Sequence, residues 1–317
     1  MWSYFTNTNF NKINLYKNNE QFIKEIKLIR SDIINMNDIN YTYTNTQISS
    51  DKINILKSSV WVSKNLSYDY LPYEVKIQWN NNHIYIKTTK KKFTKFLYRL
   101  PMFLKILEYI NKNKNDNIEI YMVLSNLKKN INHYEIISPD HINSGYTNLL
   151  NKVIFIWREE EFEKVCFHEI IHLLNQDHRH ESVQINTHIT GPQSFYEAIT
   201  DFKAIIFNII YLSLVSKIKL KILFSYEYSF IKNQANYIYD VLKNTCTQKS
   251  PAYSYFILKY YIFNYFNSFH FNKKLFNDIF YKNKNYKLLI NIIEDYKIIN
   301  TTYTNFNSAR MTLFEIK

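Results

Sequence analysis

The sequence predicts an α+β protein in which a mixed α/β N-terminal lobe, a central helix and an all-helical C-terminal lobe follow one another. Three observations indicate this class. Segments that alternate apolar and polar residues occur only in the first half of the chain, a helical segment containing HEIIH occupies the middle, and helical spacing dominates after about residue 190. The sequence contains no internal repeat.

The composition is that of a globular protein. The chain has 317 residues, 46% of them hydrophobic, so one large domain or two modest ones could each bury a core. It contains 17% aromatic residues and only 2 Gly, and it is rich in Asn, Ile, Lys and Tyr. AT-rich codons encode those four residues. We therefore interpret the composition as genome bias, from an AT-rich organism or a large DNA virus.

Charge and cysteine usage limit the partners and the compartment. The net charge is +13, but the lysines are scattered, and the densest run is only Lys90–Lys92. Because no nucleic-acid-binding motif accompanies the charge, we expect a solvated basic surface and no specific nucleic-acid partner. Cys166 and Cys246 provide no disulfide framework. With no signal-peptide core and no apolar run long enough for a bilayer, the expected location is cytoplasmic, without membrane association.

In the first sixty residues the sequence predicts one helix followed by a polar linker. Phe22, Ile26 and Ile29 recur at helical spacing within residues 18–36, which indicates an amphipathic helix. The stretch that follows is rich in Asn, Thr and Ser and is expected to be a loop. Residues 1–60 are therefore taken as an N-terminal helix and linker.

Residues 61–180 are expected to form the α/β lobe together with the central helix. Two alternating segments flank Asn80–Asn82 and predict a β-hairpin. Pro101 should kink or split the helix that follows, and Gly145 lies in a predicted loop at 138–148. The predicted strands are 73–79, 83–89, 118–124 and 152–157, and the predicted helices are 93–112 and 158–176, the latter with Glu159, Glu160, Glu161 and Glu163 in its first turns, where the helix dipole favours them.

Residues 181–317 are expected to form the helical C-terminal lobe. Gly191 and Pro192 should open its first helix, because proline is favoured at the first helical position. That start would place Glu197 more than a turn inside the helix. The predicted helices are 192–215, 227–243, 251–266 and 285–298.

The strongest chemical signal is H168-E-I-I-H172 on the central helix. Residues four apart lie on one helical face, so His168 and His172 can direct both imidazoles at one metal ion. Glu169 lies roughly 60° from His172 around the helix and can act as a general base without binding the metal. These are the ligand and base roles of the H-E-x-x-H motif.

The apolar surroundings of this motif favour a metal site over two incidental histidines. Phe167, Ile170 and Ile171 indicate a largely buried helix, on which unsatisfied imidazoles and a carboxylate would be costly. We therefore predict one Zn²⁺ per chain. Cys166 lies on the far side of the helix from His168 and is expected to be a small core residue.

Two residues compete to be the third ligand. Glu197 and Asp201 are four apart on a predicted helix, so one could bind zinc while the other accepts a hydrogen bond from a ligand imidazole. His178 is the alternative, because it follows the motif at the spacing H-E-x-x-H-x-x-G-x-x-H, with Asn175 in place of glycine. That pattern resembles the metzincins, which need a methionine turn. Met311 is the only later methionine and is remote, so Glu197 is preferred.

The segment E197-A-I-T-D201 resembles the second motif, E-A-x-x-D, of the gluzincin zinc metallopeptidases, the clan of the thermolysin-like enzymes. The resemblance implies a zincin-like fold and a zinc-dependent peptidase acting on proteins or peptides. It implies that His168, His172 and Glu197 hold the metal. It further implies that Asp201 orients His168 and that Glu169 is the general base.

The resemblance also implies roles outside these two motifs. Asn143 and Gly145 should lie in an edge segment that binds extended peptides beside the zinc helix. A C-terminal residue should stabilise the oxyanion, for which Tyr255 is our choice and His270 the alternative. The region from NSGYT to HEIIH is also similar to metalloproteinase-like proteins of large DNA viruses, which suggests packaging in a virion.

Three other functions stay open at this stage. The chain could be a catalytically silent structural or interaction protein of a virion that retains the fold. It could be a metzincin-type peptidase that uses His178. It could also be a basic nucleic-acid-binding protein with a structural zinc, which would need a fourth ligand that the sequence does not reveal. Neither the substrate nor the oligomeric state follows from the sequence.

Overall fold

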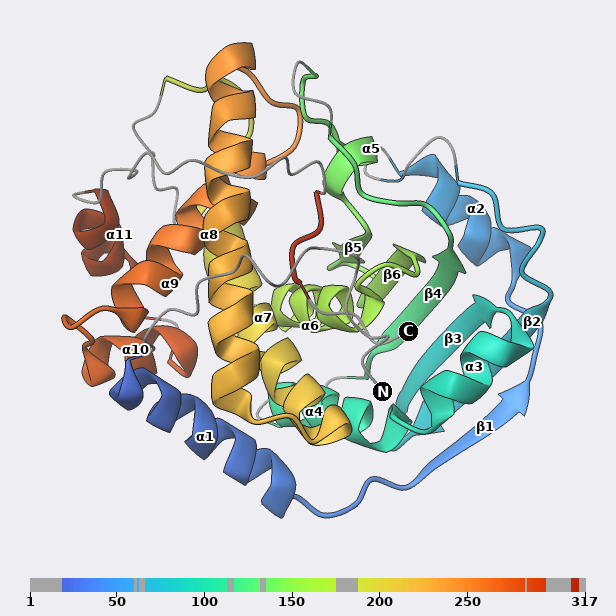
Figure 1. Cartoon of the computed structure of the whole chain (residues 1–317). Coiled ribbons are helices and arrows are strands. Elements are labelled where there is room, and N and C mark those ends of the chain that lie inside the picture. The colour runs from blue at the N-terminus through green and yellow to red at the C-terminus, as the bar shows by residue number, and fades with distance from the viewer. Residues whose placement is uncertain are drawn as a thin grey trace.

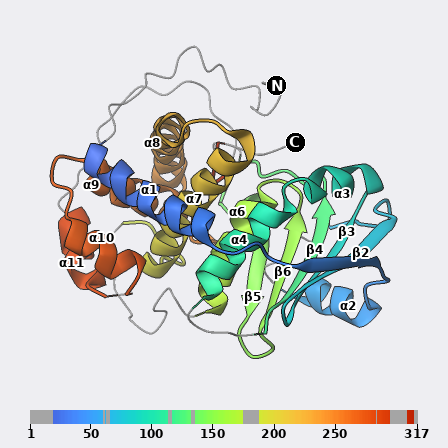
Figure 2. The same cartoon turned by 90° about the horizontal axis from the view of Figure 1, so that it is seen from below.

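The computed structural model describes residues 19–59, 62, 66–112, 117–131, 135–174, 188–282, 284–294 and 309–313. These residues form an α+β fold, as predicted, with one mixed sheet and helices packed against it. Figures 1 and 2 show the sheet at one side of the molecule and the later helices at the other.

The sheet has the strand order β1-β2-β3-β4-β6-β5. The three central strands β3, β4 and β6 are parallel to one another. β1 and β2 continue the sheet antiparallel on the β3 side, and β5 pairs antiparallel with β6 and forms the other edge. The predicted hairpin is confirmed, and Asn80 turns it with a φ of 47°, which asparagine tolerates. The strands are β1 (Tyr41–Asn45), β2 (Tyr73–Trp79), β3 (Asn82–Thr88), β4 (Glu119–Ser125), β5 (Gly145–Asn148) and β6 (Val153–Arg158).

Helices cover both faces of this sheet. α3 (Lys90–Leu97), α4 (Leu100–Asn111) and α6 (Phe162–Leu173) lie on one face, and α2 (Ser50–Ser58) lies on the other, as Figure 2 shows. Every residue of β6 is buried, because side chains from both faces meet a hydrophobic cluster. That double burial explains why the predicted strand at 152–157 reads as a continuous apolar run.

Two stretches differ from the predicted elements, and a third shows one of two predicted outcomes. The polar stretch expected to be a linker contains β1 and α2, and β1 pairs with β2 through Tyr41 and Trp79. The helix expected at 93–112 is split into α3 and α4, one of the two outcomes predicted for Pro101, which lies in the first turn of α4. The loop expected at 138–148 contains the short helix α5 (Pro139–Ile142) and β5. β1 is stabilised by pairing with the distant strand β2, and β5 by pairing with the next strand, β6, and local periodicity reveals neither pairing.

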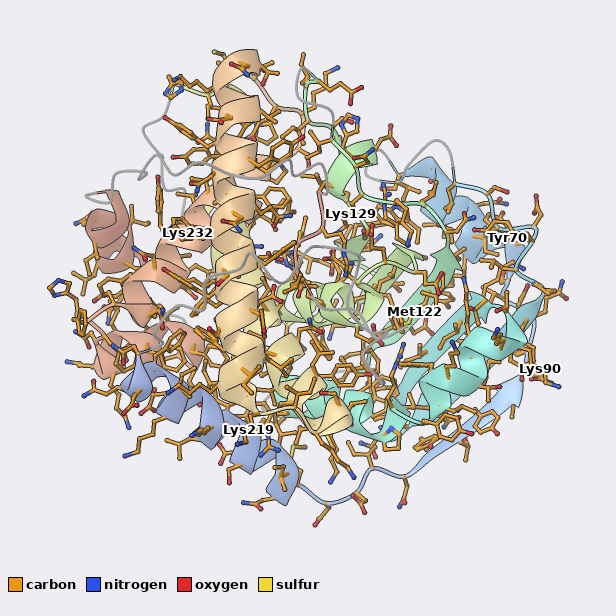
Figure 3. All side chains as sticks on the ribbon, viewed as in Figure 1. Tyr70, Lys90, Met122, Lys129, Lys219 and Lys232 are labelled. Carbon is orange, nitrogen blue, oxygen red and sulfur yellow. The ribbon has the colours of Figure 1, made fainter. Side chains whose placement is uncertain are left out.

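The acidic run before α6 also differs from its predicted role. α6 begins at Phe162, so only Glu163 lies in its first turn. Glu161 has a φ of 61° and is buried, and its carboxylate accepts hydrogen bonds from the Lys129 ammonium at 2.8 Å and the Thr312 amide at 2.6 Å. Figure 3 shows Lys129 near the middle of the molecule. Glu161 therefore makes buried ion pairs outside the helix instead of interacting with its dipole.

The second half of the described chain is helical, as predicted. After β6 it contains no strand, only the isolated bridges at Gln248 and Thr247. Phe22 of α1 packs among these helices, with ring centroids 5.3 Å from Phe224 and 5.6 Å from Phe276. The helices are α1 (Glu20–Asn35), α7 (Phe195–Ser216), α8 (Leu220–Thr245), a π-helical stretch (Tyr253–Leu258) that continues into α9 (Lys259–Asn267), α10 (Lys273–Phe280), which was not predicted, and α11 (Tyr286–Glu294).

α7 is the one helix among the described residues that is long and apolar enough to cross a membrane by length and composition. However, 89% of its most apolar window is buried inside the fold, which is the environment of a core helix. α7 packs directly against α6. This helix pair brings together the residues of the candidate site.

Candidate metal centre

α6 places the two motif histidines side by side in the interior. All of its residues are buried, because β5 and β6 pack on one side of the helix and α7 on the other. His168 and His172 lie one turn apart, and their ring centroids are 4.6 Å apart. Cys166 is fully buried, as expected of a core residue.

The start of α7 corrects one prediction and explains how Glu197 reaches the histidines. α7 begins at Phe195, with Ser194 as its N-cap, so Glu197 lies in the first turn and not more than a turn inside. Ser194 Oγ accepts a hydrogen bond from the Glu197 amide at 3.4 Å. Ser254 Oγ, and not Glu197, accepts one from the Ser194 amide at 2.8 Å. The Glu197 carboxylate is therefore not used in a reciprocal capping box.

Three ligand-type atoms converge between α6 and α7. The Nε2 atoms of His168 and His172 are 2.9 Å apart, and Glu197 Oε2 lies 3.3 Å from the first and 3.1 Å from the second. All three side chains belong to one possible metal-binding group whose ligand atoms lie within 4.8 Å of one another. Ligands of a tetrahedral zinc ion lie roughly 3.3 Å apart, given Zn–N bonds of about 2.0–2.1 Å. The triangle is thus close to the size that zinc requires.

The proton positions around His168 favour a cation at this point. His168 Nδ1 lies 3.2 Å from Oδ1 of Asp201, a fully buried carboxylate that can only accept, so Nδ1 carries the proton. Burial, together with the nearby His172, lowers the pKa of His168 to about 3, so the ring is neutral. Its Nε2 lone pair therefore faces the Glu197 carboxylate. A metal ion between these two acceptors would satisfy both.

Glu197 is held in its ionised form. Burial by itself would raise the pKa of Glu197, but the neighbouring His172 and His168 outweigh that effect and hold it well below its usual range. The residue is half-buried, with a side-chain exposure of 15% against 4% for His172. Two imidazoles and one carboxylate are the donor set of a catalytic zinc site with an open fourth position.

Asp201 also contacts two buried lysines, which sequence reasoning missed. Lys164 Nζ of α6 hydrogen-bonds to Asp201 Oδ1, and Lys259 Nζ of α9 lies 2.8 Å from Oδ2. Burial lowers the pKa of both lysines, and that of Lys259 to about 7. Lys164 is four residues before His168 and therefore lies on the same face of the helix. That spacing was the one signal in the sequence that Lys164 could reach Asp201.

Glu169 is positioned by the edge strand β5. Thr147 Oγ1 donates a hydrogen bond to Glu169 Oε2 at 2.7 Å. A Cβ atom added to Gly145 would lie 2.7 Å from Val165 Cγ1 and 3.0 Å from Glu169 Oε1, so no side chain fits there. Sequence reasoning identified Gly145 but missed Thr147, because nothing local to the strand distinguishes it from other threonines.

Tyr255 lies beside the ligand triangle. It belongs to the π-helical stretch, and its ring centroid is 5.9 Å from that of His168. Burial, then the charges of Glu197 and Glu169 and a hydrogen bond to Glu197, raise the pKa of Tyr255, so its hydroxyl keeps its proton. His270 is exposed beyond the end of α9. His178 lies outside the described residues.

A cavity of about 320 Å³ opens on these residues. Its size is typical of a small-molecule or peptide side-chain site. Asn143 also lines it, and the Asn143 Oδ1 atom accepts a hydrogen bond from Ser250 Oγ at 2.9 Å. Asp201 lies behind His168 and does not line the cavity. The predicted site residues that line the cavity are Asn143, Gly145, His168, Glu169, His172, Glu197 and Tyr255.

No protein-family model, curated protein or solved structure matches the chain. The class of site therefore rests on its own geometry. Two imidazoles and one carboxylate, with a further glutamate and a tyrosine along the same cavity, define a candidate His₂Glu metal centre.

Proposed function

We propose that the chain is a zinc-dependent peptidase of gluzincin type that hydrolyses peptide bonds in protein or peptide substrates. His168, His172 and Glu197 hold one Zn²⁺ per chain. The observation that carries the proposal is the convergence of their three ligand atoms at 2.9–3.3 Å. Two of these atoms, His168 Nε2 and Glu197 Oε2, are both acceptors, so no hydrogen bond joins them. The H-E-x-x-H and E-A-x-x-D resemblances support the same assignment, and the sheet with its antiparallel edge strand beside α6 is consistent with a zincin-like fold.

Bound zinc supplies a Lewis acid that lowers the pKa of water and polarises a carbonyl group. Glu169 takes a proton from the attacking water and passes it to the leaving amine. Tyr255 keeps its proton and donates a hydrogen bond to the developing oxyanion. Asp201 fixes the His168 tautomer, so that Nε2 faces the metal.

The substrate lies along the edge of the sheet. β5 pairs with β6 on one side only, so its other edge can pair with an extended peptide. Gly145 lets this strand approach α6 closely, and Asn143 lies where the strand enters the cavity. The scissile bond is thereby placed next to Glu169.

The deciding experiment measures zinc per chain and cleavage of a peptide library for wild type and three variants. We expect one zinc ion per chain in wild type and in Glu169→Gln, with cleavage lower by about 10²–10⁴-fold in Glu169→Gln. Glu197→Gln should lose zinc, and His178→Ala should keep it. A wild type without zinc would refute the proposal.

Two other outcomes point elsewhere. Zinc lost in His178→Ala but kept in Glu197→Gln would identify a metzincin-type site. Zinc bound by wild type without any cleavage would favour a structural or interaction protein. The matched control is His188→Ala, an exposed histidine that does not line the cavity.

The oxyanion residue has its own comparison. Tyr255→Phe removes only the hydroxyl, whereas His270→Ala removes the alternative donor. We expect cleavage to fall by about 10²-fold in Tyr255→Phe, with zinc unchanged, and to stay at the wild-type rate in His270→Ala. The reverse pattern would assign the role to His270.

A further inference from the structure

A second cavity, of about 380 Å³, lies at the other end of α6 from the histidines. It opens beyond the carboxyl ends of the parallel strands β3 and β4, next to the first turn of α3. Ligands of open α/β sheets bind at this edge of the sheet. Phe162, the first residue of α6, lines it, and His168 is roughly 9 Å further along the helix axis. The cavity is thus separate from the metal centre.

The inner surface of this cavity is apolar and aromatic. Its volume lies within the range of about 300–1,000 Å³ that is usual for small-molecule sites. Such a surface suits the hydrocarbon or aromatic body of a small molecule. The apolar lining residues are Ile86, Phe93, Phe96, Leu124 and Phe162.

The rim of the cavity is basic. Four lysines, one arginine and one glutamate line it. Lys92 pairs with Glu159 at 2.5 Å, and Arg99 pairs with Glu163 at 2.8 Å. The other three lysines, Lys91, Lys95 and Lys128, are exposed and form no ion pair with the described residues. Together with the positive end of the α3 dipole, they favour an anion.

An unpartnered hydroxyl on a buried residue that lines the cavity, on the same face of β3 as Ile86, points to a ligand independently of this charge. Thr88 is 0% exposed and lines the cavity, yet its Oγ1 has no hydrogen-bond partner among the described residues. The adjacent Thr89, by contrast, caps α3 by accepting from the Lys92 amide at 3.4 Å. A buried hydroxyl without a partner is destabilising, and valine would fit a β-strand equally well. The hydroxyl is therefore explained if a bound molecule is its partner.

We propose that this cavity binds a small organic anion, with an apolar or aromatic body and a phosphate or carboxylate group. The body packs among Phe93, Phe96 and Phe162, and the anionic group lies at the lysine rim. Thr88 donates a hydrogen bond to the bound molecule. This site is independent of the proposed peptidase function, and it gives a role to Lys91, in the densest lysine run of the sequence.

The test is calorimetric titration of the full chain with four probes. 1-Naphthyl phosphate and 1-naphthoate carry the two anionic groups on one aromatic body, 1-naphthol has the body alone, and inorganic phosphate has the charge alone. We expect one of the naphthyl anions to saturate a single site with a Kd below about 1 mM. 1-Naphthol and inorganic phosphate should each bind at least about tenfold more weakly, and added salt should weaken binding of the naphthyl anion. The better of the two naphthyl anions identifies the anionic group.

Variants locate the binding. Thr88→Val and Lys91→Glu/Lys95→Glu should each weaken binding of the preferred anion by about tenfold or more. Lys219→Glu/Lys274→Glu makes the same charge change elsewhere and should leave binding within about twofold. Figure 3 shows Lys219 and the α3 residue Lys90 far apart in the molecule.

Stability separates a ligand contact from a structural one. Thr88→Val removes an unpartnered buried hydroxyl, so the melting temperature of the ligand-free protein should stay the same or rise. The lysine variants alter exposed side chains and should fold in any case. The proposal is overturned if neither naphthyl anion saturates below about 1 mM, or if both cavity variants bind as tightly as wild type.

Discussion

At the scale of single residues, both glycines of the chain lie where a side chain cannot fit. A Cβ atom on Gly191 would lie 1.9 Å from Gln248 O, and the residue has a φ of 104°. Gly145 allows β5 to pack tightly on α6 beside Glu169. In a chain whose composition almost excludes glycine, both positions adjoin the candidate centre. Their retention is explained by close backbone packing.

Gly145→Ala should damage the general base without removing the metal. The new Cβ atom would meet Val165 Cγ1 at 2.7 Å and Glu169 Oε1 at 3.0 Å, so the strand or the carboxylate must move. We expect peptide cleavage to fall at least about tenfold, zinc content to stay at one per chain, and stability to fall by about 1–3 kcal/mol. Ser144→Ala adds no atom at the neighbouring position and is the control. Unchanged cleavage in Gly145→Ala would show that Glu169 does not need its present position.

Asp201→Asn should affect both zinc affinity and stability. The carboxylate contacts the proton of His168 and both buried lysines, Lys164 and Lys259. We expect zinc affinity to fall by about 10–100-fold and the free energy of unfolding to fall by about 3–5 kcal/mol. Chelator competition and urea denaturation measure the two effects.

A double variant separates the two roles of this carboxylate. Adding Lys164→Met to Asp201→Asn removes one buried cation, so stability should partly recover. Zinc affinity should stay low, because the imidazole still lacks its anionic partner. Recovery of both quantities together would mean that Asp201 acts on zinc only through the fold.

At the scale of elements, the sequence predicted what local patterns determine. The hairpin, the central helix and the helical second half follow from periodicity and turn residues. β1 was missed because its pairing with β2 is a tertiary contact. The start of α7 was misplaced because both Pro192 and Ser194 are helix-start signals. The hydrogen bond from the Glu197 amide to the Ser194 side chain makes Ser194 the N-cap.

The same division holds for the candidate site. HEIIH and EAITD each place their side chains on one helical face, so His168, His172 and Glu197 could be predicted. Thr147 and Lys259 could not, because their contacts join residues 22 and 58 positions apart in the chain. A lysine within an apolar helix indicates that it has a buried partner, but the local sequence does not identify that partner.

The cap of α7 is a test at this scale. Ser194 Oγ accepts from the Glu197 amide at 3.4 Å, so the cap also positions a proposed ligand. Ser194→Ala should lower the free energy of unfolding by about 1 kcal/mol and weaken zinc binding several-fold. Ser216→Ala, at the far end of α7, removes a hydroxyl bonded to Leu212 O at 2.6 Å and should leave zinc binding unchanged. Equal zinc affinity in the two variants would contradict the positioning role.

At the scale of the whole molecule, the C-terminal segment 309–313 holds the two halves of the fold together. It is buried, and Figure 1 shows it in red between α8 and the sheet. The Met311 carbonyl accepts from Lys259 at 3.1 Å, and Thr312 Oγ1 lies 2.9 Å from Glu227 of α8. The Thr312 amide donates to Glu161 before α6. Contacts from the end of the chain thereby reach the elements that carry the candidate centre.

Glu161 should make the stability of the whole molecule depend on pH in the acid range. Burial opposes its ionisation, but Lys129, Arg310 and Lys164 outweigh burial and lower its pKa from 4.5 to about 2. Because the folded-state pKa is the lower one, the contribution is fully present above pH 4.5 and is lost as the pH falls from 4.5 through 2. The shift corresponds to roughly 3 kcal/mol.

Glu161→Gln is therefore expected to be less stable than wild type at pH 7 and to converge with it as the pH falls towards 2. The variant cannot lose a charge that it lacks, so the slope of its unfolding free energy against pH is smaller in this window. Urea denaturation with a chelator present measures the slope without a contribution from zinc. Glu20→Gln changes an exposed glutamate and should give a curve parallel to that of wild type. If the Glu161→Gln curve also ran parallel to wild type, the junction of Lys129, Glu161 and Thr312 would contribute no pH-dependent stability, and its ion pair could only position the start of α6.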